Sequence, residues 1–170
     1  MNHGGNTFVD GSPRVFLCDA MLGGLARWLR AAGYEAEFDV HFDDGQLVRK
    51  AFQEMKVLLT SDSGILERYA VREGLIDYVF VPRDLEVWEQ LGYVLGKMDL
   101  DLKDARCMKC GGKLEEVTLE EVIDEVPPRV RQHCTDYWVC SRCGNVYWRG
   151  THWESISETL ARALKMAESI

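Results

Sequence analysis

Four short runs of apolar or alternating residues recur along residues 15–100. Three of them are almost wholly apolar, which is typical of strands that are covered on both faces, whereas residues 34–40 alternate polar with apolar side chains. The runs are residues 15–18, 34–40, 56–60 and 78–81. We expect each of them to form a β-strand.

A segment with helical spacing of apolar residues follows each expected strand. In residues 21–32, Leu22, Leu25 and Leu29 recur at that spacing, and Gly33 provides a stop. Three further helices are expected: one capped by Asp43 or Asp44 that carries Phe52, one over residues 63–73 that ends at Gly74, and one capped by Asp84 that extends through Leu95. Because strands alternate with helices, the pattern predicts βαβ units with a mostly parallel sheet, and the fold class is α/β.

Four of the six cysteines form two C-x-x-C-G motifs, Cys107/Cys110 and Cys140/Cys143. Two thiolates three positions apart can hold one side of a tetrahedral Zn²⁺, and the glycine lets the backbone turn with positive φ. Two such pairs leave no open position on the metal, so we expect a structural zinc site. An iron–sulfur centre or a redox dithiol is the alternative. The two remaining cysteines, Cys18 and Cys134, are interpreted as packing residues.

The composition changes at Arg106, where the alternation of strands and helices ends. Residues 107–150 are rich in cysteine, glycine and aromatic side chains, and an amphipathic helix is expected from about Thr151. The 29 residues between the cysteine pairs exceed the usual spacing, so they must contain a small excursion. We therefore divide the chain into a disordered segment (1–14), an α/β domain (15–104), a zinc ribbon (105–152) and a C-terminal helix (153–170).

Composition and charge exclude several classes of protein. The 170 residues are 46% hydrophobic and 28% charged, which is typical of a soluble globular protein. The formal net charge of −8 argues against coating of nucleic acid by net charge, although a local basic face can still bind it. No apolar run is long enough for a membrane span, and residues 1–6 do not have the pattern of a signal peptide. We expect a cytoplasmic protein that does not enter the membrane.

Carboxylates stand at the carboxyl ends of two expected strands. Asp19 comes directly after the first strand, and Asp62 follows the third. In an open parallel sheet such positions line the ligand crevice, so the two can converge, and Asp43 or Asp44 can supply a third carboxylate. These short side chains suit Mg²⁺ or Mn²⁺, which can activate a water and stabilise the charge on a phosphodiester. The alternative is that each aspartate is merely an N-cap.

Three separated motifs and both cysteine pairs share their order with a known family. The motifs are FLCDAMLGGLARWLR at residues 16–30, LLTSD at residues 58–62 and VYWRGTH at residues 146–152. Together they resemble the Mut-seven C-terminal RNase family, and the resemblance covers residues 15–155. It implies a PIN-like, three-layer nuclease domain with a mostly parallel sheet, fused to a zinc ribbon.

The resemblance also implies a metal-dependent endoribonuclease that acts on RNA. Its acidic site would consist of Asp19, Asp44 and Asp62 around Mg²⁺ or Mn²⁺. Asp44 is preferred to Asp43 because the family pattern places an acid three positions before the helix leucine, here Leu47. A water activated by the cation would attack the phosphodiester in line and leave a 3′-hydroxyl.

Basic and aromatic residues alternate in the second half of the ribbon. Residues 127–153 contain four arginines against one aspartate, interleaved with tyrosines and tryptophans. Arginines pair with phosphates and aromatic rings stack on unpaired bases, so we expect RNA contacts here and on the first helix. The candidates are Arg27, Arg30, Arg129, Arg131, Arg142, Arg149, Trp148 and His152. The alternative makes Trp138 and Tyr147 core residues, His152 a capping or packing residue, and the first-helix arginines a solvated face.

The leading hypothesis is a cytoplasmic, metal-dependent endoribonuclease whose structural zinc ribbon aids RNA binding. The alternative is a non-catalytic RNA- or protein-binding module on the same fold, and an intact acidic triad favours the enzyme. A phosphatase-like hydrolase of small phosphates shares the metal chemistry, but we would expect it to show a deeper and more closed pocket.

Overall fold

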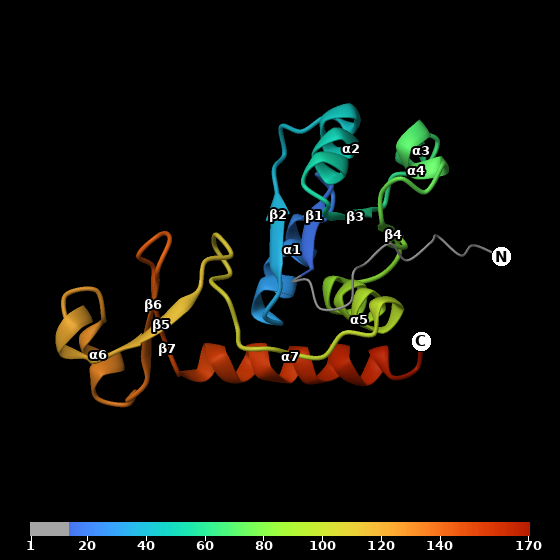
Figure 1. Ribbon diagram of the computed structural model, residues 1–170. Coiled ribbons are helices and arrows are strands. Elements are labelled where there is room, and N and C mark those ends of the chain that lie inside the picture. The colour runs from blue at the N-terminus through green and yellow to red at the C-terminus, as the bar shows by residue number, and fades with distance from the viewer. Residues whose placement is uncertain (1–13) are drawn as a thin grey trace.

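The computed structural model describes residues 14–170, which form two sheets with helices packed around them (Figure 1). The first sheet has four parallel strands, and the second is a three-stranded antiparallel sheet in the cysteine-rich part. The α/β class predicted from the sequence is therefore confirmed. The N-terminal segment that we predict to be disordered lies, apart from Arg14, outside the described residues.

The parallel sheet is built from the four apolar or alternating runs. Its strands are β1 (Val15–Cys18), β2 (Glu35–Phe38), β3 (Val57–Thr60) and β4 (Tyr78–Phe80). They follow the order β2-β1-β3-β4, so β1 and β3 are neighbours at the centre, where Cys18 is paired with Leu59. Because all four strands are parallel, their carboxyl ends lie at one edge of the sheet.

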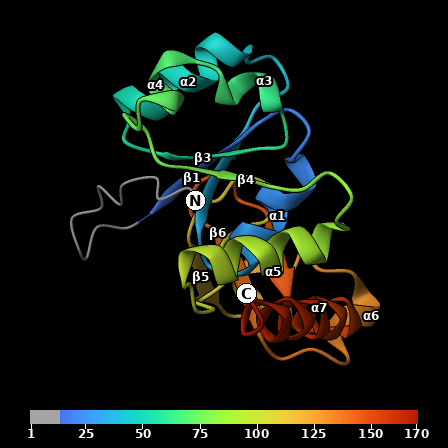
Figure 2. The same ribbon diagram turned by 90° about the vertical axis from the view of Figure 1, so that its right-hand side faces the viewer.

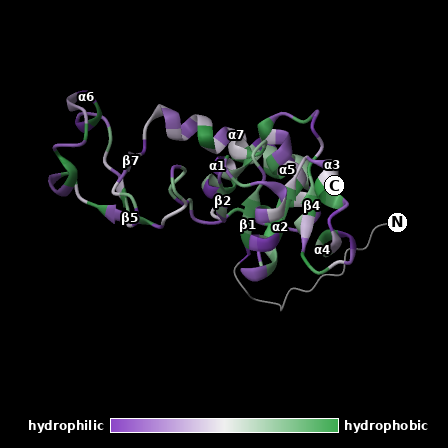
Figure 3. Ribbon diagram, turned by 90° about the horizontal axis from the view of Figure 1, so that it is seen from above, coloured by the Kyte–Doolittle hydropathy of each residue, from purple (hydrophilic) through white to green (hydrophobic). Residues whose placement is uncertain are grey.

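Helices cover both faces of this sheet and make three layers (Figure 2). One face carries α1 (Gly23–Ala31) and α5 (Val87–Met98), and the other carries α2 (Asp44–Gln53), α3 (Ser63–Leu66) and α4 (Tyr69–Arg72). Successive side chains of a strand point to opposite faces, so Phe16 and Cys18 pack on the α1 side and Leu17 on the α2 side. Both faces being covered, β1 is hydrophobic along its length, as Figure 3 shows.

The helix that we expect over residues 63–73 is instead two short helices, and the prediction of one continuous helix is wrong. The helix breaks at Arg68, whose backbone is extended with a ψ of 137°. On one straight helix Ile65 and Val71, six positions apart, would point about 120° away from each other. Both are buried in one cluster against the sheet, and the break makes this possible. Gly74 then follows with a φ of +67°, as expected for a stop.

The helix after β4 begins later than the sequence predicts. We expect Asp84 to cap it, whereas α5 begins at Val87 and Glu86 is its N-cap. The Glu89 carboxylate accepts a hydrogen bond from the Glu86 N–H at 2.8 Å, and the Trp88 indole donates to the Glu86 carboxylate at 2.9 Å. These contacts fix the start of the helix and leave Asp84 in the exposed loop before it.

The cysteine-rich part forms the antiparallel sheet, with the order β5-β6-β7. Its strands are β5 (Leu114–Val117), β6 (Tyr137–Cys140) and β7 (Val146–Trp148). The long insert between the two cysteine pairs contains β5, the short 3₁₀ helix η1 (Glu120–Val122) and α6 (Pro128–Arg131). This is the excursion that the spacing of the cysteines predicts.

The ribbon has a small core of its own, which lies on the Tyr137 side of its sheet. The Tyr137 hydroxyl donates to the carbonyl oxygen of Cys134 at 2.6 Å, and Cys134 packs against this core as expected. Trp138 is paired with Tyr147 on the opposite face of the sheet, and both are only half-buried. The alternative that makes these two aromatics the core is therefore wrong. The buried core residues are Val122, Val126 and Tyr137.

The last helix, α7 (Thr151–Ala167), runs from the ribbon to the α/β layers and packs along α5 (Figure 1). The two helices approach closely because α5 presents glycines. A Cβ atom at Gly92 would lie 2.8 Å from the carbonyl oxygen of Ala163, and one at Gly96 2.7 Å from that of Ala167. Ala163 is fully buried in the cluster that contains α1 and α5. None of the helices in residues 14–170, α7 included, is long and apolar enough to cross a membrane.

Candidate active site and zinc site

The four cysteines of the two C-x-x-C pairs come together at the end of the ribbon. Their Sγ atoms all lie within 4.8 Å of one another, with 3.7 Å between Cys107 and Cys143 and 3.4 Å between Cys110 and Cys140. Thiolates about 2.3 Å from a tetrahedral Zn²⁺ are about 3.8 Å apart, so the group fits this ion. All four cysteines are free thiols. The structure thus contains a group that could bind zinc, as predicted.

The backbone around the cysteines has the form of two metal-binding knuckles. Gly111 and Gly144, which follow the two pairs, have φ values of +78° and +69°. In the second knuckle the N–H groups of Arg142 and Cys143 point at the Cys140 Sγ from 3.4 and 3.5 Å. Hydrogen bonds of this kind orient a cysteine as a metal ligand.

The two thiols of the first knuckle differ in how readily they lose a proton. Burial raises the pKa of the Cys107 thiol, but hydrogen bonds from the Tyr147 hydroxyl and from neighbouring backbone groups outweigh it and lower the pKa to about 6. Burial and the adjacent sulfurs instead raise the pKa of Cys110 to about 12. The first thiolate therefore forms easily and the next is opposed, and a dication at the centre would compensate the additional negative charge.

Arg30 fixes the first knuckle to the α/β layers. Its side chain is buried, its Nε donates to the carbonyl of Ala36 at 2.8 Å, and its Nη1 donates to those of Met108 and Lys109 at 3.1 and 3.0 Å. Because the guanidinium is buried and directed at three carbonyl groups, its role is structural. We predict Arg30 as an RNA contact, but its guanidinium is engaged in hydrogen bonds that link two parts of the fold.

Glu35 on β2 adds two ion pairs to the same junction. Its carboxylate lies 3.2 Å from Arg106 and 3.1 Å from Arg142, and Arg142 also donates to the carbonyl of Cys110 at 2.7 Å. Both knuckles are therefore held against β2, the outer strand of the parallel sheet. Arg142, a predicted RNA contact, is engaged within the protein, although its side chain is 53% exposed.

Replacing Arg30 with Leu is expected to lower the free energy of unfolding by about 2 to 3 kcal/mol, because one buried and two partly buried carbonyl groups lose their donor at about 1 kcal/mol each. Urea unfolding measures this, and elemental analysis should show unchanged zinc content, since all four cysteines remain. Arg27→Leu, on the exposed side of the same helix, is the matched control and should change stability by less than about 0.5 kcal/mol. An Arg30→Leu variant as stable as the control would contradict the structural role.

Asp19, directly after β1, is almost fully buried, with 3% of its surface exposed. Its Oδ1 accepts the N–H of Met21 at 2.8 Å, and its Oδ2 accepts the Thr60 hydroxyl at 2.6 Å and the Ser61 N–H at 2.8 Å. A carboxylate offers about four acceptor positions, so these bonds leave one, on Oδ1. Asp19 therefore joins the ends of β1 and β3 and keeps one position for a further ligand.

Thr60 and Ser61, which stand in the LLTSD motif without a predicted role, connect Asp19 to its surroundings. The Thr60 hydroxyl donates to Asp19 and accepts the N–H of Asp62 at 2.9 Å, so it links the two aspartates. The Ser61 hydroxyl donates to the carbonyl of Val81 at 2.8 Å. Both side chains are buried. Their signal in the sequence is the pair of hydroxyl residues that ends an apolar run directly before an aspartate.

Asp62 is the N-cap of α3, which is one of the two roles that the sequence allows for it. Its Oδ1 caps the helix by accepting the N–H of Gly64 at 2.8 Å. Within residues 14–170 its other oxygen, Oδ2, has no hydrogen-bond partner. The side chain is half-buried, so that oxygen can bind a ligand from solvent without loss of the cap.

Asp44 is the first residue of α2, and the N-cap of that helix is Asp43. The Asp43 carboxylate accepts the Gln46 N–H at 2.8 Å, and the Gln46 side chain accepts the Asp43 N–H at 3.0 Å. Capping by Asp43 leaves the Asp44 carboxylate available, and it pairs with Arg68 at 3.6 Å. Its side chain is 41% exposed.

The three aspartates thus lie at the same edge of the sheet but do not form one ligand group. Asp19 and Asp62 follow the two central strands and are linked through Thr60, whereas Asp44 follows β2. Over residues 14–170 the group of potential ligands within 4.8 Å of one another consists of the four cysteines, not the aspartates. One cation held by all three would therefore require side-chain movement.

The candidate RNA contacts on the ribbon have different environments. Arg149 is exposed, pairs with Asp136 at 3.2 Å and lies 5.7 Å from the centre of the Trp138 ring. Arg131 donates to two carbonyl groups of the insert, which gives it a structural role. Arg129 is exposed. Of these arginines, Arg131 and Arg149 already have partners within the protein.

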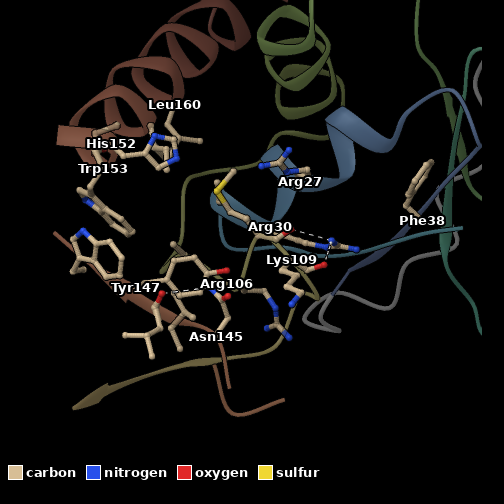
Figure 4. A pocket seen from close by; sticks show the side chains of 18 of the residues that line it. Arg27, Arg30, Phe38, Arg106, Lys109, Asn145, Tyr147, His152, Trp153 and Leu160 are labelled. Atoms are coloured by element: carbon tan, nitrogen blue, oxygen red, sulfur yellow. Dashed lines mark hydrogen bonds between the residues drawn. The ribbon is translucent and has the colours of Figure 1, made fainter. Parts of the chain in front are cut away.

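The other candidates, Arg27, Trp148 and His152, line one cleft of about 680 Å³. The cleft lies between α1, the first knuckle, the ribbon and the start of α7 (Figure 4). His152 is exposed in the first turn of α7, whose N-cap is Gly150, so it does not cap that helix.

The α/β fold, the acidic edge of its sheet and the four-cysteine group define a two-part protein with a candidate metal site in each part. The chain belongs to the Mut7-C RNAse domain family, whose model matches residues 14–160. No curated protein and no solved structure matches the chain. Membership confirms the resemblance seen in the sequence, supports a ribonuclease role and implies RNA as the substrate.

Proposed function

We propose that the chain is a divalent-metal-dependent endoribonuclease, with its active site at the sheet edge that carries Asp19, Asp44 and Asp62. The observation that carries this proposal is the environment of Asp19. A nearly buried carboxylate, held by donors from the ends of both central strands, keeps one acceptor position and is linked through Thr60 to Asp62. A buried carboxylate is unfavourable unless its charge is compensated, and a bound cation compensates it.

Each residue of the edge has a role in this proposal. Asp19 and Asp62 hold Mg²⁺ or Mn²⁺ through their remaining oxygens, which are the ligand type that these cations prefer. Thr60 and Ser61 orient Asp19 by hydrogen bonds, as partners behind a metal ligand do. When bound, the cation supplies activation of water and stabilisation of the charge that develops on the phosphodiester.

Asp44 completes the acidic site by leaving its ion pair with Arg68. The pair is exposed and long, at 3.6 Å, so it contributes little to stability and separates easily. Its separation adds a third carboxylate to the cation and frees the Arg68 guanidinium to pair with a phosphate oxygen.

The remaining assignments follow from the two-part structure. The four thiolates form a closed site, so we propose a structural Zn²⁺ in a ribbon of residues 105–152, beside a PIN-like nuclease domain of residues 15–104 and a C-terminal helix of residues 153–170. The layered parallel sheet supports the PIN-like assignment. Free thiols in such a site persist in a reducing compartment, and we propose the cytoplasm.

Incubation of the zinc-loaded protein with 5′-labelled single-stranded RNA tests the proposed activity. We expect internal cleavage with Mn²⁺ or Mg²⁺, products that end in a 3′-hydroxyl, and no cleavage in buffer from which these ions were removed by desalting. Desalting is preferred to a chelator because a chelator also removes zinc. Cleavage at the same rate without added cation would contradict the proposal.

A non-catalytic RNA- or protein-binding module is the second candidate. It is favoured by the aspartates, which do not form a ligand group, and by the ion pair that engages Asp44. In the same experiment such a module would leave RNA intact with every divalent cation.

A further inference from the structure

We infer that the cleft between α1, the first knuckle and α7 binds an unpaired base of a single-stranded RNA. This inference rests on the proposed function for RNA as the substrate and adds the class of RNA and the site that selects it. Three parts of the chain form the walls: α1 contributes Arg27, the first knuckle contributes Lys109, and the ribbon and α7 contribute Tyr147 and Trp153. Figure 4 shows the two aromatic side chains on one side of the cleft and the two cations across from them.

The charge of the cleft is opposite to that of the protein. The arginine and lysine side chains in its lining are Arg27, Arg30, Arg106 and Lys109. The lining contains no carboxylate, although the chain has a net charge of −8. Arg30 and Arg106 are directed at carbonyl groups and Glu35. The side chains of Arg27 and Lys109 are exposed and have no polar partner within residues 14–170. Two free cations at the rim of an acid-free cleft suit the phosphates of a polyanion.

The aromatic wall continues a stack that leads into the cleft. Trp153 lies nearly parallel to Trp138, with ring centres 5.7 Å apart and planes at 15°, and the Arg149 guanidinium lies 5.7 Å from the centre of the Trp138 ring. Trp153 lines the cleft, whereas Trp138 does not. The next planar group in this series would therefore be one inside the cleft, and a nucleobase has the flat surface that stacks on such a ring.

The size of the cleft favours a single strand as its occupant. A volume of about 680 Å³ is in the range of small-molecule pockets and can take one base with its sugar. A duplex keeps its bases stacked inside and cannot insert one, whereas a single strand presents them freely. A free mononucleotide offers the same base and phosphate, but only a strand also reaches the acidic edge.

One end of the cleft adjoins that edge. Gly23 lines the cleft and follows Asp19 by four positions, and Phe38, also in the lining, is the last residue of β2. In Figure 4 Phe38 lies apart from the aromatic wall, towards the far end of the cleft. A strand whose base is held between Trp153 and Lys109 is thereby directed along α1 to the carboxyl ends of the strands.

Fluorescence anisotropy with the full, zinc-loaded chain in Mn²⁺-free buffer tests this inference. The probes are a labelled unstructured RNA of 12 nucleotides, the same RNA as a duplex, an abasic strand of the same length, and a labelled mononucleotide. We expect the unstructured RNA to bind about tenfold or more tightly than each of the other three, because only it offers both stacking and several phosphates. Equal binding of the duplex or of the abasic strand would overturn the inference.

The double variant Arg27→Ala/Lys109→Ala should weaken binding of the single strand about tenfold and reduce the salt dependence by about one for each lost phosphate contact. Its matched control is Arg49→Ala/Lys165→Ala, which removes the same charges from exposed positions outside the cleft. Equal weakening by both variants would overturn the inference. RNA that binds as expected but is not cut when Mn²⁺ is added contradicts the proposed function alone, whereas cleavage without selective binding contradicts the cleft alone.

Discussion

Asp62→Asn is expected to reduce Mn²⁺-dependent cleavage of single-stranded RNA by about a thousandfold or more and to leave the fold intact. The loss is large because the cation supplies several kcal/mol of transition-state stabilisation, at about 1.4 kcal/mol for each factor of ten. The fold is kept because the amide oxygen of Asn can still accept the Gly64 N–H, and Asn is a good N-cap. Single-turnover cleavage and thermal unfolding measure the two effects.

Asp124→Asn is the matched control, since it makes the same change at an exposed position of the ribbon insert. It should cleave at the wild-type rate. An Asp62→Asn variant that cleaves as fast as this control would remove Asp62 from the active site.

Asp19→Asn should also abolish cleavage, but its effect on the fold differs. Both Asp19 oxygens accept hydrogen bonds, so the new NH₂ group must face either the Met21 N–H or the donors of Thr60 and Ser61. A donor left without an acceptor costs about 1 to 3 kcal/mol of stability. Removing the charge of Asp19 also relieves its repulsion with the other carboxylates, which would stabilise the metal-free protein. We expect the lost hydrogen bond to outweigh this gain. Asp62→Asn is therefore the cleaner test of catalysis.

Cys140→Ser is expected to unfold residues 107–150 and to remove zinc from the protein. Cys140 is 1% exposed and its Sγ lies 3.4 Å from that of Cys110, so a hydroxyl in its place breaks the ligand set. Structural zinc contributes about 10 to 16 kcal/mol of apparent binding energy in small zinc domains, more than so small a core can replace. The parallel sheet keeps its own two clusters and should remain folded.

Elemental analysis and limited proteolysis measure this prediction together. The variant should contain no zinc, and its cleavage sites should be confined to residues 107–150. Cys134→Ser changes a cysteine outside the group and should keep one zinc per chain. Wild-type protein without zinc, or with mainly iron, would contradict the assignment.

The parts of the fold that depend on local patterns could be predicted from the sequence. Each strand of the parallel sheet is a short run of residues, and each knuckle has its two cysteines three positions apart, so both signals are contained in a few residues. The same local reasoning predicts one helix over residues 63–73, whereas the structure has two short helices there, α3 and α4. Helical spacing alone does not show that Ile65 and Val71 must face the same cluster.

The roles of single polar residues could not be predicted, because their partners are distant in the sequence. In the sequence Arg30 resembles any helix residue that faces solvent. Its partners Met108 and Lys109, whose carbonyl groups accept its hydrogen bonds, come 78 and 79 positions later. Thr60 likewise becomes part of the acidic edge only because β3 lies beside β1, 41 positions away at Asp19. The ends of the expected strands and the resemblance to the family identified the aspartates as candidates, but the side chains that orient them required the structure.

Titration of Mn²⁺ into the zinc-loaded, desalted protein, followed by electron paramagnetic resonance of the free ion, tests the central claim most directly. The wild-type protein should remove at least one Mn²⁺ per chain from solution, because Asp19 and Asp62 offer it their remaining oxygens. Asp62→Asn should lose this binding, whereas Asp124→Asn should keep it. Equal Mn²⁺ binding by wild type and Asp62→Asn would contradict a metal-dependent active site at the edge of the sheet.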